Sequence, residues 1–212
     1  MKKILLIGDS IRKGYDKYVE LAMEDVAKVY YPNENCRFAA YVLRHLPNWK
    51  KELELGDDVD CIHWNAGLWD DLHQIDGKPL TDIALYKEYI ERICHTMPLL
   101  FPNATFIFAT STAVQEDKYN GYFKRYNCET EEYNAAAIEI VTRYGHKIND
   151  LYALTKDMPK SFYTDCTHFY TKEGTKLSTE AVLRCLEADL GVTSKPLDYD
   201  ALFTKSTNVV GI

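Results

Sequence analysis

The stretch that decides the fold is residues 3–11, KILLIGDSI. Residues 4–7 are an apolar run, too short for a membrane span or for the core of a signal peptide, and they predict a buried β-strand. Gly8, Asp9 and Ser10 follow at once, and these residue types favour turns and helix starts. The chain therefore opens with a strand that leads directly into a turn carrying a serine.

Apolar runs and amphipathic stretches alternate along the rest of the chain. Strands are expected at residues 3–7, 26–30, 59–64, 105–110 and 146–149. Helices are expected at residues 15–25, 38–50, 82–97, 129–144 and 172–190, with Asp82 as an N-cap and Gly145 as a C-cap. Pro47 is expected to end or kink the second of these helices.

This alternation predicts one α/β domain over residues 1–212, with a tail after about residue 191 that carries no clear pattern. Crossovers between parallel strands are right-handed, so helices cover both faces of the sheet. The expected fold is a three-layer α/β/α sandwich of the flavodoxin-like kind, with a five-stranded parallel sheet in the order 2-1-3-4-5. In that order the ligand crevice lies beyond the carboxyl ends of strands one and three, where Ser10 stands.

Composition excludes several classes of protein. The 212 residues carry a net charge of -7, which argues against a nucleic-acid surface and against binding to anionic membranes. Six scattered cysteines, with no C-x-x-C pair, indicate reduced thiols in a cytoplasmic protein rather than a metal site. No metal and no organic cofactor is expected.

A second informative block is residues 165–168, DCTH, just before the last expected helix. A carboxylate and an imidazole three residues apart can meet within one turn. Asp165 would then hold the tautomer of His168, whose other ring nitrogen can deprotonate a serine. Each block by itself is also typical of an ordinary turn, but together they predict Ser10 as nucleophile, His168 as base and Asp165 as its support.

These two blocks resemble the GDSL/SGNH hydrolase superfamily, which has G-D-S-[LI] after the first strand and D-x-x-H before the last helix. The resemblance covers the chain up to about Leu190. It implies that a carboxylic ester is hydrolysed through an acyl-enzyme on Ser10, with Asp165 and His168 completing a triad. The G-x-S-x-G motif of the α/β-hydrolases is absent.

The resemblance also implies an oxyanion hole, built from a glycine amide after the second strand and an Asn side chain from G-x-N-D after the third. No glycine follows the second strand here, and the Cys36 amide is the candidate to replace it. After the third strand, Gly67 falls on the family's glycine, but Trp69 stands where Asn belongs. An indole offers one N–H and copies a carboxamide poorly.

We therefore expect Asn65 to be the side-chain donor, the alternative being a turn-forming residue at a strand end. Arg37, near the crevice, is a candidate for binding an anionic group of the substrate. Its alternative is an ordinary surface arginine.

The expected substrate is a short-chain or acetyl ester of a small molecule or a carbohydrate, because no long apolar stripe indicates an acyl tunnel. Two alternatives stay open. One is a lysophospholipase or thioesterase of the same family. The other is a flavodoxin-like module that binds a small molecule in the same crevice without catalysis.

Overall fold

The computed structural model describes residues 1–205, so residues 206–212 of the expected tail lie outside the described part. Its sheet is parallel and five-stranded, in the order β2-β1-β3-β4-β5, which confirms the predicted topology. The strands are β1 (Lys2–Ile7), β2 (Ala27–Tyr30), β3 (Cys61–Trp64), β4 (Thr105–Ala109) and β5 (Lys147–Asn149).

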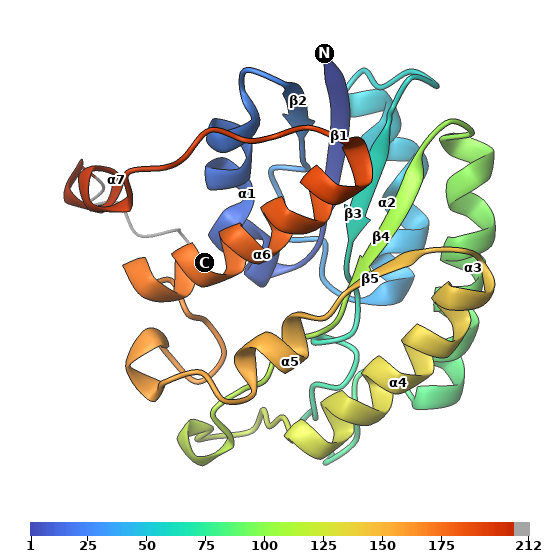
Figure 1. The fold of residues 1–212 in the computed structure, drawn as a ribbon. Coiled ribbons are helices and arrows are strands. Elements are labelled where there is room, and N and C mark those ends of the chain that lie inside the picture. The colour runs from blue at the N-terminus through green and yellow to red at the C-terminus, as the bar shows by residue number, and fades with distance from the viewer. Residues whose placement is uncertain (206–212) are drawn as a thin grey trace.

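Helices cover both faces of this sheet (Figure 1). They are α1 (Ser10–Met23), α2 (Ala39–Glu52), α3 (Ile83–Leu100), α4 (Asn127–Arg143), α5 (Leu151–Thr155), α6 (Lys172–Leu190) and α7 (Tyr199–Lys205). Side chains alternate along a strand, and β1 shows this directly. Leu5 and Ile7 pack with α2, α3 and α4, whereas Ile4 and Leu6 pack with α1 and α6.

Two helices differ from the sequence expectation in ways that matter locally. Helix α1 begins at Ser10 itself, five residues earlier than expected, because the Asp9 carboxylate caps it and accepts the Ile11 N–H at 2.8 Å. Of the two expected effects of Pro47, ending or kinking the second helix, the first is wrong, since α2 runs through Pro47 to Glu52. Proline has no backbone N–H, so the carbonyl of Leu43, four residues earlier, loses its helical partner. Pro47 is exposed on the helix surface, where water can hydrogen-bond to that carbonyl instead.

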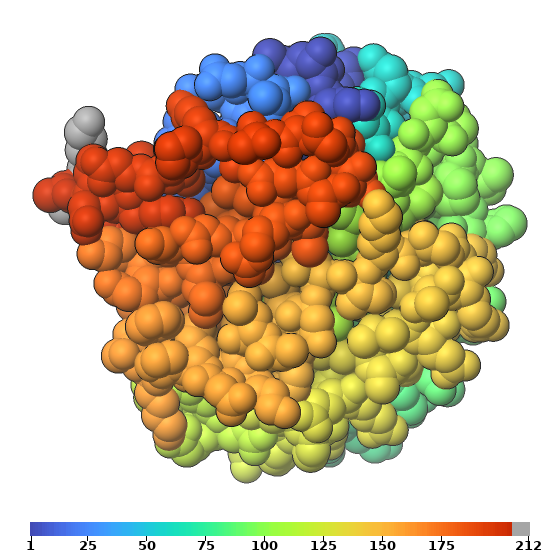
Figure 2. Space-filling view, viewed as in Figure 1, coloured from blue at the N-terminus to red at the C-terminus, as the bar shows by residue number. Residues whose placement is uncertain are grey.

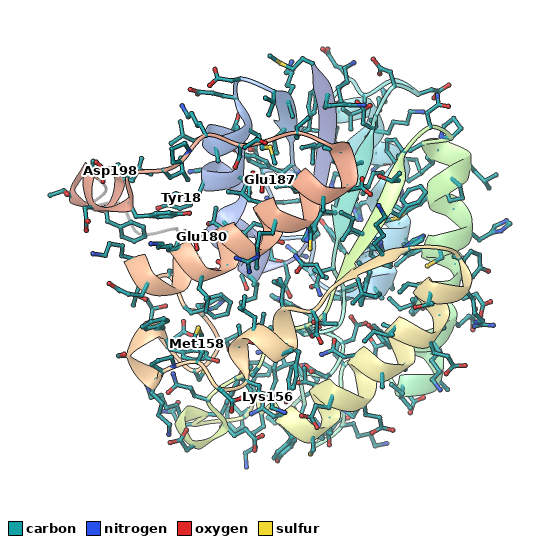
Figure 3. The ribbon with its side chains drawn as sticks, in the orientation of Figure 1. Tyr18, Lys156, Met158, Glu180, Glu187 and Asp198 are labelled. Atoms are coloured by element: carbon teal, nitrogen blue, oxygen red, sulfur yellow. The ribbon has the colours of Figure 1, made fainter. Side chains whose placement is uncertain are left out.

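The segment after α6 runs back beside α6 and past α1 to α7, and it forms a band across the upper part of the face drawn in Figure 2. The Lys195 N–H donates to the Ala22 carbonyl at 2.8 Å, and Glu187 accepts from the Ser194 hydroxyl at 2.7 Å. Tyr18 of α1 stacks on aromatic rings of α7 (Figure 3). Among residues 1–205, no helix is long and apolar enough to cross a membrane.

Two histidines are buried in the core, and their hydrogen bonds define their tautomers. An indole N–H only donates, so His146 Nδ1 accepts from Trp64 at 3.2 Å. The Asn149 amide likewise donates to His63 Nε2 at 3.0 Å. Burial lowers the pKa of both histidines to about 4. Both rings are therefore neutral near pH 7, with the proton on Nε2 of His146 and on Nδ1 of His63.

We predict that neither imidazole titrates between pH 5 and pH 8, and that ¹⁵N NMR of the rings reports these two tautomers. The folded-state pKa lies below the ~6.5 of an unfolded histidine. As pH falls from about 6.5 toward 4, the unfolded state therefore binds the proton first. Each ring should then lower the free energy of unfolding by ~1.4 kcal/mol per pH unit over that window. A ring titration midpoint above pH 5 would contradict the prediction.

Candidate active site

Ser10 stands at the carboxyl end of β1 as the first residue of α1. Its backbone N–H makes no hydrogen bond within residues 1–205. That N–H belongs to the positive end of the helix dipole, which favours negative charge nearby. The local structure thus offers a serine hydroxyl beside a free backbone donor.

The turn at residues 164–168 brings Asp165 and His168 together. One carboxylate oxygen, Oδ1, accepts the backbone N–H groups of Thr167 and His168, each at 2.7 Å. The other, Oδ2, lies 2.7 Å from His168 Nδ1. Burial alone would raise the pKa of Asp165, but these donors outweigh it and the pKa is lowered. Asp165 is therefore an ionised acceptor near neutral pH.

The free nitrogen of His168 meets Ser10. Because an ionised carboxylate only accepts, the proton of the neutral imidazole lies on His168 Nδ1, which donates a hydrogen bond to Asp165. His168 Nε2 then accepts the Ser10 hydroxyl, and the two heavy atoms lie 2.7 Å apart. The structure therefore brings the three residues of the expected triad into one hydrogen-bonded chain whose direction suits removal of the serine proton.

The loop after β2 holds two of the residues that the sequence analysis singled out. The Cys36 N–H donates to the Gly8 carbonyl at 3.1 Å, so it would have to leave that bond to serve an oxyanion. Arg37 is exposed, with φ at 53° and its guanidinium 4.8 Å from the ring centre of Tyr41. By contrast, the N–H of Phe38 makes no hydrogen bond within the described residues. Phe38 was missed, because only the folded loop reveals which amide is free.

The loop after β3 holds the other three candidate residues, Asn65, Gly67 and Trp69. Asn65 donates one amide N–H to the Ala109 carbonyl at 2.7 Å and keeps a second N–H. Gly67 has φ at 152°, and a Cβ there would lie 2.5 Å from Ser111 Oγ, so a side chain is excluded. Trp69 is half-buried, and its indole N–H makes no hydrogen bond within residues 1–205. Asn65 and Trp69 thus both remain candidate donors.

Arg125 is a residue that the sequence analysis missed, and it connects three loops of the site. Its Nε donates to the Leu68 carbonyl at 2.5 Å, and Nη1 donates to the Tyr119 hydroxyl at 2.8 Å. The Tyr119 hydroxyl in turn shares a hydrogen bond of 2.6 Å with Thr167 Oγ1, in which either hydroxyl can donate. No local pattern marks Arg125, because its partners lie far away in the sequence.

Arg125 also neutralises a buried carboxylate. Asp71 Oδ1 lies 3.3 Å from Arg125 Nε, as an ion pair without hydrogen-bond geometry, because that N–H points to Leu68. Burial raises the pKa of Asp71 to about 7, and Arg125 opposes this rise. Within residues 1–205, no group of three or more His, Cys, Asp or Glu side chains could hold a metal ion.

The fold is shared with solved structures of ester hydrolases. A lipase/acylhydrolase from Enterococcus faecalis is 21% identical, with a TM-score of 0.69 over 93% of this chain and 100% of that one. A GDSL-like lipase from Bacteroides thetaiotaomicron is 13% identical, with a TM-score of 0.63 over 88% of each chain. An acetylxylan esterase from Geobacillus stearothermophilus is 15% identical, with a TM-score of 0.65 over 90% of this chain and 94% of that one.

No protein-family model matches the chain, and no curated protein matches it by sequence. The structural likenesses show that the chain shares its fold with a lipase/acylhydrolase and a GDSL-like lipase.

We predict that Arg125→Met destabilises the protein by about 3 kcal/mol at pH 8, because it leaves the Asp71 carboxylate buried without its counter-ion. The loss should shrink at pH 5, where Asp71 is protonated and needs no partner. Chemical denaturation at the two pH values measures this. Arg125→Met/Asp71→Asn should recover part of the loss, and Arg37→Met, at an exposed arginine, is the matched control. An equal loss at both pH values would refute the ion-pair explanation.

Proposed function

We propose that this chain, whose fold is that of GDSL-like lipases and acylhydrolases, is a serine esterase that hydrolyses a carboxylic ester through an acyl-enzyme. The observation that carries the proposal is the chain of two 2.7 Å contacts from Ser10 through His168 to Asp165. A directed serine–imidazole–carboxylate chain is the arrangement that activates a serine hydroxyl.

In the proposed reaction the Ser10 oxygen attacks the ester carbonyl while its proton moves to His168 Nε2. Asp165 stabilises the imidazolium through the Nδ1 proton, and His168 then protonates the leaving alcohol. Water, deprotonated by the same ring, releases the acyl group from Ser10 in the second half of the reaction. The Ser10 proton thus leaves with the alcohol, and the proton that His168 takes from water replaces it on Ser10 when the acid is released.

The oxyanion needs donors in place before the reaction begins. The free N–H of Ser10 is the first candidate. The N–H of Phe38 is the second, because it belongs to the loop after β2, from which the family glycine donates. Asn65 or Trp69 in the loop after β3 would supply the third. In this proposal the chain differs from the family in the residues that donate to the oxyanion. The loops after β1, β2 and β3 each still supply a candidate donor.

A short acyl group on a carbohydrate or another small alcohol is the substrate class that we propose. Half-buried Phe38 and Trp69 stand in the loops after β2 and β3, which flank β1 in the sheet. Aromatic side chains there can pack against a sugar ring. One structural neighbour is an acetylxylan esterase.

All six cysteines are free thiols, which supports a reducing compartment such as the cytoplasm for this enzyme.

We expect a fluorophosphonate probe to add once to the protein, on Ser10, as read by intact mass and peptide mapping. Ser10→Ala should lose both the label and hydrolysis of p-nitrophenyl acetate, while Ser161→Ala, at an exposed serine, keeps both. His168→Ala should lower kcat by roughly 10³-fold or more, because the triad acts as a unit. His95→Ala on α3 is its control. A wild-type protein that takes no label would favour the non-catalytic binding module instead.

Two substitutions distinguish the candidate donors after β3. If Asn65 donates to the oxyanion, Asn65→Ala should lower kcat by ~10²–10³, as for one lost donor, and leave KM nearly unchanged. If Trp69 donates, Trp69→Phe should show that loss, since it removes the N–H and keeps most of the ring. Steady-state kinetics on both variants decides between them. Losses below about tenfold in both would assign the oxyanion to the backbone amides alone.

A further inference from the structure

Tyr170, two residues after His168, contacts both partners of the serine–histidine hydrogen bond. Its hydroxyl donates to the Ser10 carbonyl at 2.5 Å. Its ring stacks on the His168 imidazole, with ring centres 4.9 Å apart and 28° between the planes. The Tyr170 side chain therefore hydrogen-bonds to the backbone of Ser10 and stacks on the ring of His168.

Gly14 of α1 makes room for this ring. It is a buried residue in the second turn of the helix. A Cβ at that position would lie 2.6 Å from Cε1 and 2.8 Å from Cδ1 of Tyr170, closer than real Cβ atoms approach. Glycine is a poor helix former, so its presence inside α1 calls for a packing reason. The Tyr170 ring supplies that reason, since it occupies the space that a side chain at position 14 would need.

We propose that Tyr170, seated on Gly14, is the positioning residue of the catalytic base, an inference that rests on the proposed serine-esterase function. An imidazole on a surface turn can rotate about two side-chain bonds. Stacking on Tyr170 restricts that rotation, and the bond from the Tyr170 hydroxyl to Ser10 ties the same ring to the first turn of α1. His168 and Ser10 thus keep their relative position as one unit.

The physical consequence is a loss of kcat when the unit is loosened, since small misplacements of reacting groups cost up to about 10²-fold in rate. Tyr170→Phe keeps the stacked ring and deletes only the hydroxyl, so kcat should fall by ~3–10-fold with KM unchanged. Tyr170→Ala deletes both contacts and should cost ~10²-fold in kcat. Gly14→Ala should cost nearly as much, because its methyl group displaces the ring.

The decisive experiment is the double variant Gly14→Ala/Tyr170→Ala. If Gly14 matters only because it seats Tyr170, adding Gly14→Ala to Tyr170→Ala should lower kcat no further and should raise Tm, since alanine favours the helix. Kinetics with p-nitrophenyl acetate, rates of fluorophosphonate labelling and thermal unfolding supply the three readouts. Tyr163→Phe is the matched control, because it removes a hydroxyl that donates to the Ala113 carbonyl at 3.0 Å from the same loop.

Two outcomes would overturn the inference where Tyr170→Ala folds. One is a kcat within twofold of wild type for Tyr170→Ala. The other is a loss from Gly14→Ala that is equally large in the presence and in the absence of the Tyr170 ring. If Tyr170→Ala does not fold, unchanged kcat in both Tyr170→Phe and Gly14→Ala would overturn it as well. A wild-type protein that is not labelled at Ser10 would instead refute the proposed function.

Discussion

The hydrogen bond between Ser10 and His168 joins residues 158 positions apart, and it depends on how two helices lie on one face of the sheet. Helix α1 starts at Ser10, and α6 starts shortly after His168. The two helices pack against each other on the same face (Figure 1). Both begin near the carboxyl edge of the parallel strands, so the segments before them meet there. This placement brings the two chemical motifs to one point.

Two buried guanidinium groups fix the loops around that point. Arg12 of α1 forms an ion pair with Asp16 and donates to the Glu34 carbonyl in the loop after β2. Arg125 contacts the loop after β3 and, through Tyr119, the turn that carries His168. Arginine suits this role because its planar group offers several donors in fixed directions. The crevice is thus bordered by loops that are cross-linked through charge-assisted hydrogen bonds.

The supply of oxyanion donors is where this chain departs most from the pattern it resembles. The loop after β2 has no glycine, and Arg37 adopts the positive φ there. Cys36 donates its N–H to Gly8, whereas the Phe38 N–H makes no hydrogen bond within residues 1–205. A backbone donor in this loop does not require a glycine, because every residue other than proline carries an N–H.

The sequence by itself determined the five strands, the five main helices, the sheet order and the two motif blocks. These features depend on short-range information: apolar periodicity, residues that favour turns, and a three-residue spacing that fits within one turn. It did not determine the start of α1 at Ser10, which follows from the Asp9 cap, or the continuation of α2 through Pro47.

Only the tertiary structure decided which amides of the site are free, that Arg125 links three loops, and that Gly14 receives the Tyr170 ring. Each of these depends on a partner far away in the sequence, brought near by packing of the helices and loops on the sheet. Periodicity records which face of an element is buried. It carries no information on which distant side chain that face will meet, because that is set by the packing of the whole domain.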